Sequence, residues 1–266
     1  MKNNIPSSLR YNVLALLFIL LGIPAAVFAA SDKYEKWDTA HDNGWSYKVK
    51  LGFVLGGTTP IPFPASIRSI DGFSTYGSTM LGFETTRNVV GNRLGITSGV
   101  RLTLEGMSTE ARVKNYHMSL VQGGEKMEGF YTGINKSHER MLTVTVPVLA
   151  SYRVCPRWTL KCGPYFQWLL YRKFTGRVYD GYLREGDPTG QKIAFTKENP
   201  ATYDFSNDMR RFLWGAEVGA DWQATNRLSA FTYLDFGING VFHGGFKTID
   251  FTMYPVFLTL GLACSL

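Results

Sequence analysis

The chain has 266 residues, a formal charge of +7 at pH 7, three cysteines and four histidines. The positive excess is modest and the long connecting segments carry both signs, so no nucleic-acid or polyanion groove is indicated. Cys155, Cys162 and Cys264 are too few for a disulfide framework or a structural zinc site. Cys155 and Cys162 flank one turn, however, and could pair in an oxidising compartment.

The start of the chain is typical of a cleaved signal peptide. Lys2 and Arg10 form a positively charged start, 13–23 is apolar, and Val27-Phe28-Ala29 is a small-residue cleavage pattern. The apolar run is shorter than the roughly twenty residues that a membrane-spanning helix needs. We therefore predict three parts. They are a signal peptide over residues 1–29, a periplasmic segment over 30–44 and a single β-barrel domain over 45–266.

Alternation of apolar with small or polar residues recurs along this domain and predicts β-strands. The last strand has an unbroken apolar row on its even positions, from Tyr254 to Leu266. Short links between strands alternate with long ones, as in bacterial outer-membrane barrels, whose periplasmic turns are short. The expected strands are eight in number: 47–55, 79–85, 94–105, 141–154, 158–173, 211–223, 228–239 and 254–266. The long connections are 57–78, 106–139, 175–210 and 240–253.

Alternation alone does not say which face points outward, because a soluble lipocalin-like barrel has the same period. The apolar rows contain no charged residue over the length that a tilted strand needs to cross hydrocarbon. Aromatic residues gather near the strand ends, as interfacial girdles require. These are Trp158, Trp168, Phe212, Trp214 and Trp222. We therefore predict an all-β, antiparallel, up-and-down transmembrane barrel with short periplasmic turns and long extracellular loops, located in the outer membrane.

The inward rows of such a barrel hold charged residues, and in a narrow lumen these must pair. We expect a structural network of salt bridges there, with a narrow ion or proton path as the functional alternative. The members of this expected network are Lys48, Lys50, Glu84, Arg101, Glu105, Arg153, Lys161, Arg211, Glu217, Asp221 and Asp235. Pro147, Pro164 and Pro255 lack an N–H within these strands, which predicts local bulges or rim positions.

Several segments resemble the PorT-like outer-membrane barrels of the Bacteroidetes, which are small barrels of the OmpA/OmpX type. Residues 142–149 followed by Tyr152-Arg153 are similar to that family's "ExPLLLKY" strand, with Thr145 in place of the glutamate. Gly163-Pro164-Tyr165 is similar to its "GPYLGYLL" strand, and 215–233 to a glycine-rich hairpin. The resemblance implies an outer-membrane barrel of about eight strands, and the family's founding member is associated with type IX secretion.

No pattern in the chain predicts catalytic, cofactor-binding or metal-binding residues. His41, His117, His138 and His243 lie in no metal-ligand or nucleophile motif. An acyl-transfer site built from His117 and His138 with Ser119 and Ser137 is the enzymatic alternative, and it would act on lipid.

We therefore expect a structural or binding protein and not an enzyme, with outer-membrane lipid around it. Its long loops would contact extracellular or secretion-system proteins, and nucleic acid is not expected as a partner. A soluble secreted barrel that binds an apolar ligand is a further alternative. Aromatic residues in the long loops are the candidates for binding, because loops on a rigid scaffold form natural binding surfaces. They are Phe73, Tyr76, Phe130, Tyr131, Tyr179, Tyr182 and Tyr203. The alternative is that these aromatic side chains pack on one another and cap the barrel.

Overall fold

The computed structural model describes residues 44–266 apart from Asn92 and Lys247. The predicted signal peptide and nearly all of the predicted periplasmic segment lie outside the described residues. None of the helices in the described part of the chain is long and apolar enough to cross a membrane.

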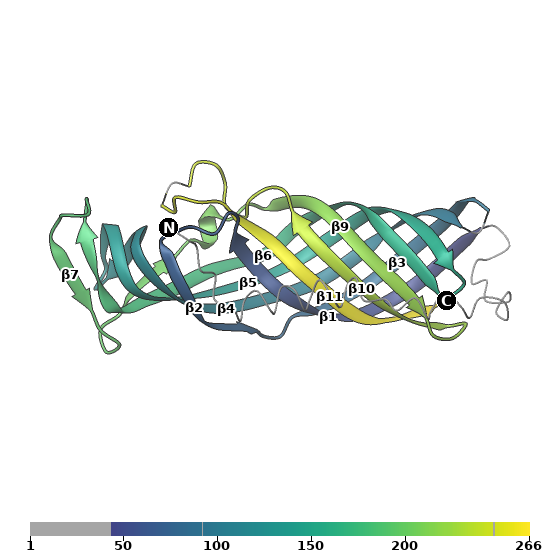
Figure 1. The fold of residues 1–266 in the computed structure, drawn as a ribbon, viewed down its shortest axis with the longest axis horizontal. Coiled ribbons are helices and arrows are strands. Elements are labelled where there is room, and N and C mark those ends of the chain that lie inside the picture. The colour runs from purple at the N-terminus through teal and green to yellow at the C-terminus, as the bar shows by residue number, and fades with distance from the viewer. Residues whose placement is uncertain (1–43, 92, 247) are drawn as a thin grey trace, which may run out of the picture. The chain divides into compact units, whose positions relative to one another are not determined.

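Eight strands close into one antiparallel ring (Figure 1), which confirms the predicted fold class. Around the ring each strand pairs with the next, and the last pairs back to the first, with Val49 opposite Cys264. In this order the ring strands are β1 (Trp45–Pro60), β3 (Thr79–Val90), β4 (Leu94–Gln122), β5 (Glu125–Cys155), β6 (Trp158–Glu185), β9 (Phe212–Gln223), β10 (Leu228–Gly237) and β11 (Met253–Ser265).

The apolar rows predicted to face lipid do lie on the outside of the ring. On β1, Leu51 is 64% exposed and Phe53 is 71% exposed, whereas Lys50, the residue before Leu51, is 1% exposed. This is the inverse of a soluble barrel, and it is the arrangement of a transmembrane one. The first exposed charges beyond the apolar band are Arg140 on β5 and Lys173 on β6. The parts of these two strands beyond Leu142 and Tyr171 therefore lie outside the membrane.

Beyond the membrane the chain forms more strand than the sequence predicted. The connections 106–139 and 175–210 were expected as loops, and this expectation was wrong in detail. The β4–β5 ladder continues to Gln122 opposite Glu125, and the β5–β6 ladder to Gly129 opposite Glu185. We call this part, together with the short elements that pair with it, the external shell. Those elements are β2 (Ile67–Thr75), β7 (Lys192–Phe195), β8 (Ala201–Asp204) and the 3-10 turn η2 (Ser206–Asp208).

β-Bulges set the inner face of the external shell. In β4 the register slips between Val113 and Tyr116, where Asn115 has a φ of 54°. In β6 it slips at Leu170, between Leu169 and Tyr171. An extra residue in one strand moves every later side chain to the opposite face. The inward row therefore changes from odd to even positions, and Lys173, which simple alternation places inside, faces outward. A further slip in β6, at Asp180 and Gly181, returns the inward row to odd positions such as Leu183.

The prolines cause no bulge of the predicted kind, although ladder pairs are missing beside Pro147 and Pro164. Pro147 lies opposite Tyr165 and Pro164 lies opposite Ala216, and neither position has a slip in register. The Ser98 hydroxyl donates to the Pro147 carbonyl at 2.8 Å, so this oxygen is used by a side chain. Only Pro255, opposite Thr58 near the end of β1, lies toward the rim as expected.

Candidate functional site

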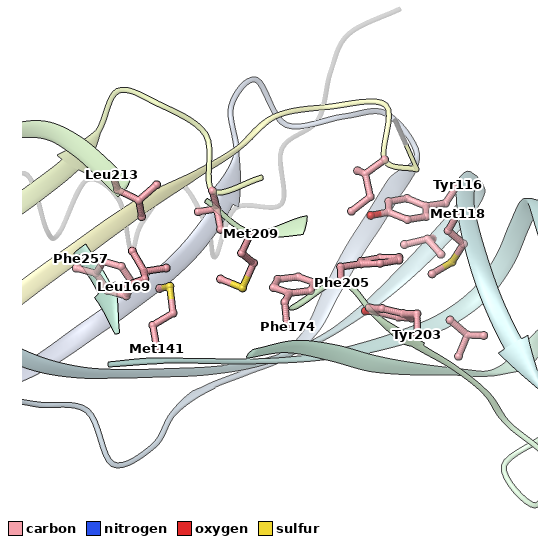
Figure 2. Close-up of a cluster of buried hydrophobic side chains, with 14 of the residues drawn as sticks. Tyr116, Met118, Met141, Leu169, Phe174, Tyr203, Phe205, Met209, Leu213 and Phe257 are labelled. Carbon is pink, nitrogen blue, oxygen red and sulfur yellow. The ribbon is translucent and has the colours of Figure 1, made fainter. Parts of the chain in front are cut away.

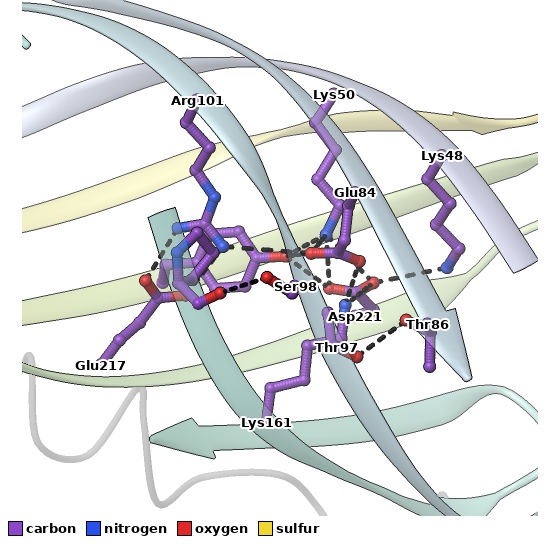
Figure 3. A network of polar contacts seen from close by, with 12 residues as sticks. Lys48, Lys50, Glu84, Thr86, Thr97, Ser98, Arg101, Lys161, Glu217 and Asp221 are labelled. Atoms are coloured by element: carbon purple, nitrogen blue, oxygen red, sulfur yellow. Dashed lines mark hydrogen bonds and ion pairs between the residues drawn. The ribbon is translucent and has the colours of Figure 1, made fainter. Parts of the chain in front are cut away.

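An ion-pair network lies in the part of the lumen nearer the short turns and connects several strands (Figure 3). Asp221 on β9 receives Lys50 from β1 at 3.3 Å and Lys161 from β6 at 2.8 Å. Glu84 on β3 binds the same two lysines, at 2.8 Å and 2.5 Å. Each of these four side chains is almost fully buried. A buried ion is costly unless an opposite charge compensates it, and here each lysine contacts both carboxylates.

A second pair completes the network. Arg101 on β4 binds Glu217 on β9 through two nitrogens, at 2.8 Å and 2.9 Å. Tyr233 on β10 lies between the two groups: its hydroxyl donates to Glu84 at 2.9 Å, and its ring lies 4.1 Å below the Arg101 guanidinium carbon. Sequence alternation placed Tyr233 on the inward face but did not identify it as part of the network.

The other predicted members of the network lie at its edge or outside it. Lys48 joins at its edge, 3.4 Å from Asp221. Glu105 is buried and Asp235 is half-buried, and each keeps one carboxylate oxygen without a hydrogen-bond partner in the described structure. Arg153 is half-buried near the turn-side end of β5. Arg211 is exposed, because β9 begins one residue later, so its assignment to the lumen was wrong.

An apolar layer lies beyond the network and separates it from the external shell. Figure 2 shows a row of buried side chains that runs from Leu213, Phe257, Leu169 and Met141 through Met209 to Phe174. Such close-packed layers leave few voids larger than a water molecule. The lumen is thus occupied first by paired charges and then by apolar side chains.

A cavity of ≈ 280 Å³ lies beyond this layer, inside the external shell. Its walls come from β1, β2, β4, β5, β6, β8, β11 and the segment before β11. Its deep wall contains the aromatic group of Phe174, Tyr203 and Phe205, in which the last two rings stack at 4.8 Å (Figure 2). The remaining wall is mostly apolar and includes Met107, Ala111, Val113, Tyr116, Met118, Ile249 and Phe251.

Few polar groups reach the cavity. Asn135 and Ser137 on β5 lie in its wall, and the Tyr203 hydroxyl donates to the Asn135 side-chain oxygen at 2.9 Å. Burial raises the pKa of Tyr203, so the phenol stays protonated and neutral. Burial likewise raises the pKa of Tyr116. The described lining residues include no Asp, Glu, Lys, Arg or His.

The aromatic residues predicted as loop binding candidates have several different positions. Phe73 is exposed on β2 and Tyr203 is buried on β8, and both line the cavity. Tyr76 is exposed beyond the end of β2. Tyr131 and Tyr179 are buried, so their interpretation as exposed loop residues was wrong; they belong to ladder strands of the external shell. Phe130 and Tyr182 are half-buried on β5 and β6.

The histidines and serines of the enzymatic alternative do not converge. His117 lies opposite Phe130 in the β4–β5 ladder, and His138 is eight residues further along β5. At about 3.4 Å per residue this places the two rings roughly 27 Å apart along the strand. His41 lies outside the described residues. No group of three or more His, Cys, Asp or Glu side chains in the described part of the chain could hold a metal ion.

The fold and the inverted burial define a transmembrane β-barrel, and the comparison with protein families agrees. The model described as "Outer membrane protein beta-barrel domain" matches residues 28–243, and the chain belongs to this family. The protein is therefore located in the outer membrane. None of the curated proteins matches the sequence significantly.

Two solved structures illustrate the kind of barrel to which the chain is similar. One is Ail, the attachment invasion locus protein of Yersinia pestis, solved in complex with the heparin analogue sucrose octasulfate. It is 9% identical, with a TM-score of 0.35 over 84% of this chain and 99% of Ail. The other is OprG from Pseudomonas aeruginosa, 10% identical, with a TM-score of 0.32 over 86% of this chain and 98% of OprG.

Proposed function

We propose that the protein is a non-enzymatic binding protein of the outer membrane and that the external cavity is its ligand site. The observation that supports this most is a partly open, mostly apolar cavity inside the external shell, outside the membrane. An empty cavity costs stability because its lining loses packing contacts. A purely structural barrel would gain by filling it, whereas a binding protein needs the space.

The lining indicates a neutral, largely apolar ligand. A charged ligand would have to give up its hydration without an opposite charge in the wall, which is costly. The rings of Phe174, Tyr203 and Phe205 suit an aromatic or flat aliphatic body, while Asn135 and Ser137 suit one hydroxyl or carbonyl group. An engineered cavity of about 150 Å³ holds benzene. The ≈ 280 Å³ available here therefore has room for a two-ring molecule.

The surroundings of the cavity favour capture over passage. On its inner side lie the apolar layer and then the ion-pair network. On its outer side the lining residues Phe63, Ile70 and Phe73 are exposed. A ligand would enter between these side chains and be retained in the external shell.

The first prediction concerns a simple probe, 1-naphthol, added to the protein in nanodiscs. We expect saturable one-to-one binding after the signal of empty nanodiscs is subtracted, measured by naphthol fluorescence. In Ala111→Trp the new ring occupies the cavity, and we expect the affinity to fall by at least about tenfold, the equivalent of about 1.4 kcal/mol.

The matched control is Arg112→Trp, because Arg112 is the next residue of β4 and is exposed on its other face. Its pair with Asp71, at 3.5 Å, is a surface pair and contributes little to stability. The proposal is wrong if naphthol does not saturate on the unaltered protein, or if both variants bind it as well as the unaltered protein does.

A partner protein from secretion or envelope assembly is the second candidate. It is supported by the resemblance to PorT-like barrels and by the exposed side chains of Phe73 and Tyr76 beside the outer edge of β2. The two candidates respond differently to Ala111→Trp. Filling the cavity would abolish ligand capture but leave the Tyr76 surface intact, so a partner that docks there would still bind.

A further inference from the structure

Four basic side chains lie on the outward face of the β5–β6 ladder, just beyond the apolar band. Arg140 on β5 lies directly opposite Lys173 on β6, and Lys136 lies directly opposite Arg177. We call these four residues the basic stripe. Residues directly opposite each other in an antiparallel ladder have Cβ atoms about 5 Å apart, and like charges in such pairs are destabilising. Two such pairs on one face, with only His138 and Thr175 between them, favour a bound anion.

The protein itself supplies little negative charge here. Glu110 on β4 binds Lys136 at 3.3 Å, and Asp204 on β8 lies opposite Thr175, between Lys173 and Arg177. Within the described part of the chain, none of the ion pairs includes Arg140, Lys173 or Arg177. Positive charge therefore remains on the surface of the stripe.

His138, in the middle of the stripe, reports on this charge. Its outward neighbours are Lys136 and Arg140 on β5, Lys173, Thr175 and Arg177 on β6, Ser108 and Glu110 on β4, and Asp204 on β8. Partial burial, and then the charges of Lys136 and Arg177, hold the pKa of His138 below its ordinary value. The basic side chains thus outweigh the acidic ones at this position.

The height of the stripe identifies the source of the anion. Immediately below it on the same outward face are Tyr171 and then Trp168, both exposed. Aromatic side chains in such a position lie at the level of the lipid headgroups. The β1 and β11 ends that carry Trp45 and Ser265 are at the opposite, short-turn side of the barrel, so the stripe faces the outer leaflet.

We propose that the basic stripe binds the phosphate groups of an outer-leaflet lipid, with Arg140 and Lys173 as its principal contacts. Arginine offers a planar pair of donors that matches two phosphate oxygens, and lysine adds a point charge beside it. A phosphate lying between the two side chains converts a repulsive cross-strand pair into an attractive group of three. This site is on the outside of the barrel and is independent of the cavity.

The test uses the full chain in mixed detergent micelles, titrated with bisphosphorylated lipid A, with dephosphorylated lipid A and with inorganic phosphate. We expect Arg140→Gln/Lys173→Gln to weaken binding of bisphosphorylated lipid A by about tenfold to thirtyfold, as expected for two cations near an anionic lipid. We also expect dephosphorylated lipid A to bind weakly to every form. On binding of the phosphorylated lipid, the pKa of His138, followed by NMR, should rise.

The control variant is Lys126→Gln/Lys192→Gln, which removes the same charge at exposed positions near the far end of the external shell. Migration of the folded barrel on unheated gels verifies that both variants fold. The proposal fails if the control loses as much affinity as the stripe variant, or if the stripe variant binds unchanged. It also fails as a lipid site if inorganic phosphate alone binds as tightly as bisphosphorylated lipid A.

Discussion

At the scale of single residues, the lumen depends on charges that satisfy one another. The Arg101–Glu217 pair is the clearest case, because it is bidentate, buried and covered by the ring of Tyr233. Removing one partner of such a pair leaves an uncompensated charge, whereas replacing both with apolar groups is often tolerated. Each charge of the pair is therefore tolerated in the lumen only because the other is present.

We expect Glu217→Gln to lower the free energy of unfolding by about 3 kcal/mol. The double variant Arg101→Met/Glu217→Met should recover most of this loss, because it leaves no buried charge behind. Urea unfolding in detergent micelles, followed by tryptophan fluorescence, measures both values. The exposed Arg112–Asp71 pair is the comparison, and Arg112→Gln should cost less than about 1 kcal/mol. Equal costs for Glu217→Gln and Arg112→Gln would contradict this account.

At the scale of elements, the sequence predicted every ring strand but not the external shell. Within the membrane the two faces of a strand meet lipid and lumen, so alternation is uninterrupted, as in 141–154 and 254–266. The bulge at Leu170, at the edge of the membrane, and the bulge at Asn115, beyond it, each shift the inward row by one position, and the alternation can no longer be followed. The segment 106–139 was therefore interpreted as a loop, and its aromatic residues as loop residues.

The candidate site was predictable only in part, for the same reason. Lys50, Glu84, Arg101, Lys161, Glu217 and Asp221 were identified because inward charges in a narrow barrel must pair. The cavity was not, since its lining comes from many separate elements and depends on the bulge in β4. Phe73 and Tyr203 were selected as aromatic residues, but no pattern in the sequence showed that they share one cavity.

The β4 bulge supplies a prediction of its own. Asn115 has a left-handed backbone, a conformation that glycine and asparagine tolerate and β-branched residues do not. We expect Asn115→Val to destabilise the external shell by about 1–2 kcal/mol, while Asn115→Gly remains close to the unaltered protein. Limited thermolysin digestion of the folded barrel would show faster cleavage of Asn115→Val between β4 and β5. Equal cleavage of the two variants would mean that the bulge does not depend on this conformation.

At the scale of the whole described molecule, the barrel is a closed support for an external shell. An eight-stranded ring has an interior just wide enough for side chains. Here those side chains are ion-paired around Glu84 and Asp221 and apolar around Met141 and Leu213. This arrangement argues against the alternative of a narrow ion path through the lumen.

We therefore expect the reconstituted protein to show no steady single-channel current in a planar bilayer, in high salt and under an applied voltage. Water and ions would have to pass the buried ion pairs around Glu84 and Asp221 and the packed apolar side chains around Met141 and Leu213. A general porin reconstituted in the same bilayer serves as the positive control. A reproducible, ohmic current from the unaltered protein would contradict a closed lumen.

The ladder between β1 and β11 has a consequence for how the barrel is made. It joins the first and last strands, so its contacts have the largest sequence separation of any pairing in the ring. Contacts of this kind carry the greatest loop-closure entropy and tend to form late in folding. Until they form, both strands present open edges to which foreign strands can add. Pairing of β1 with β11, which closes the barrel, is thus also the step of assembly that most needs protection from aggregation.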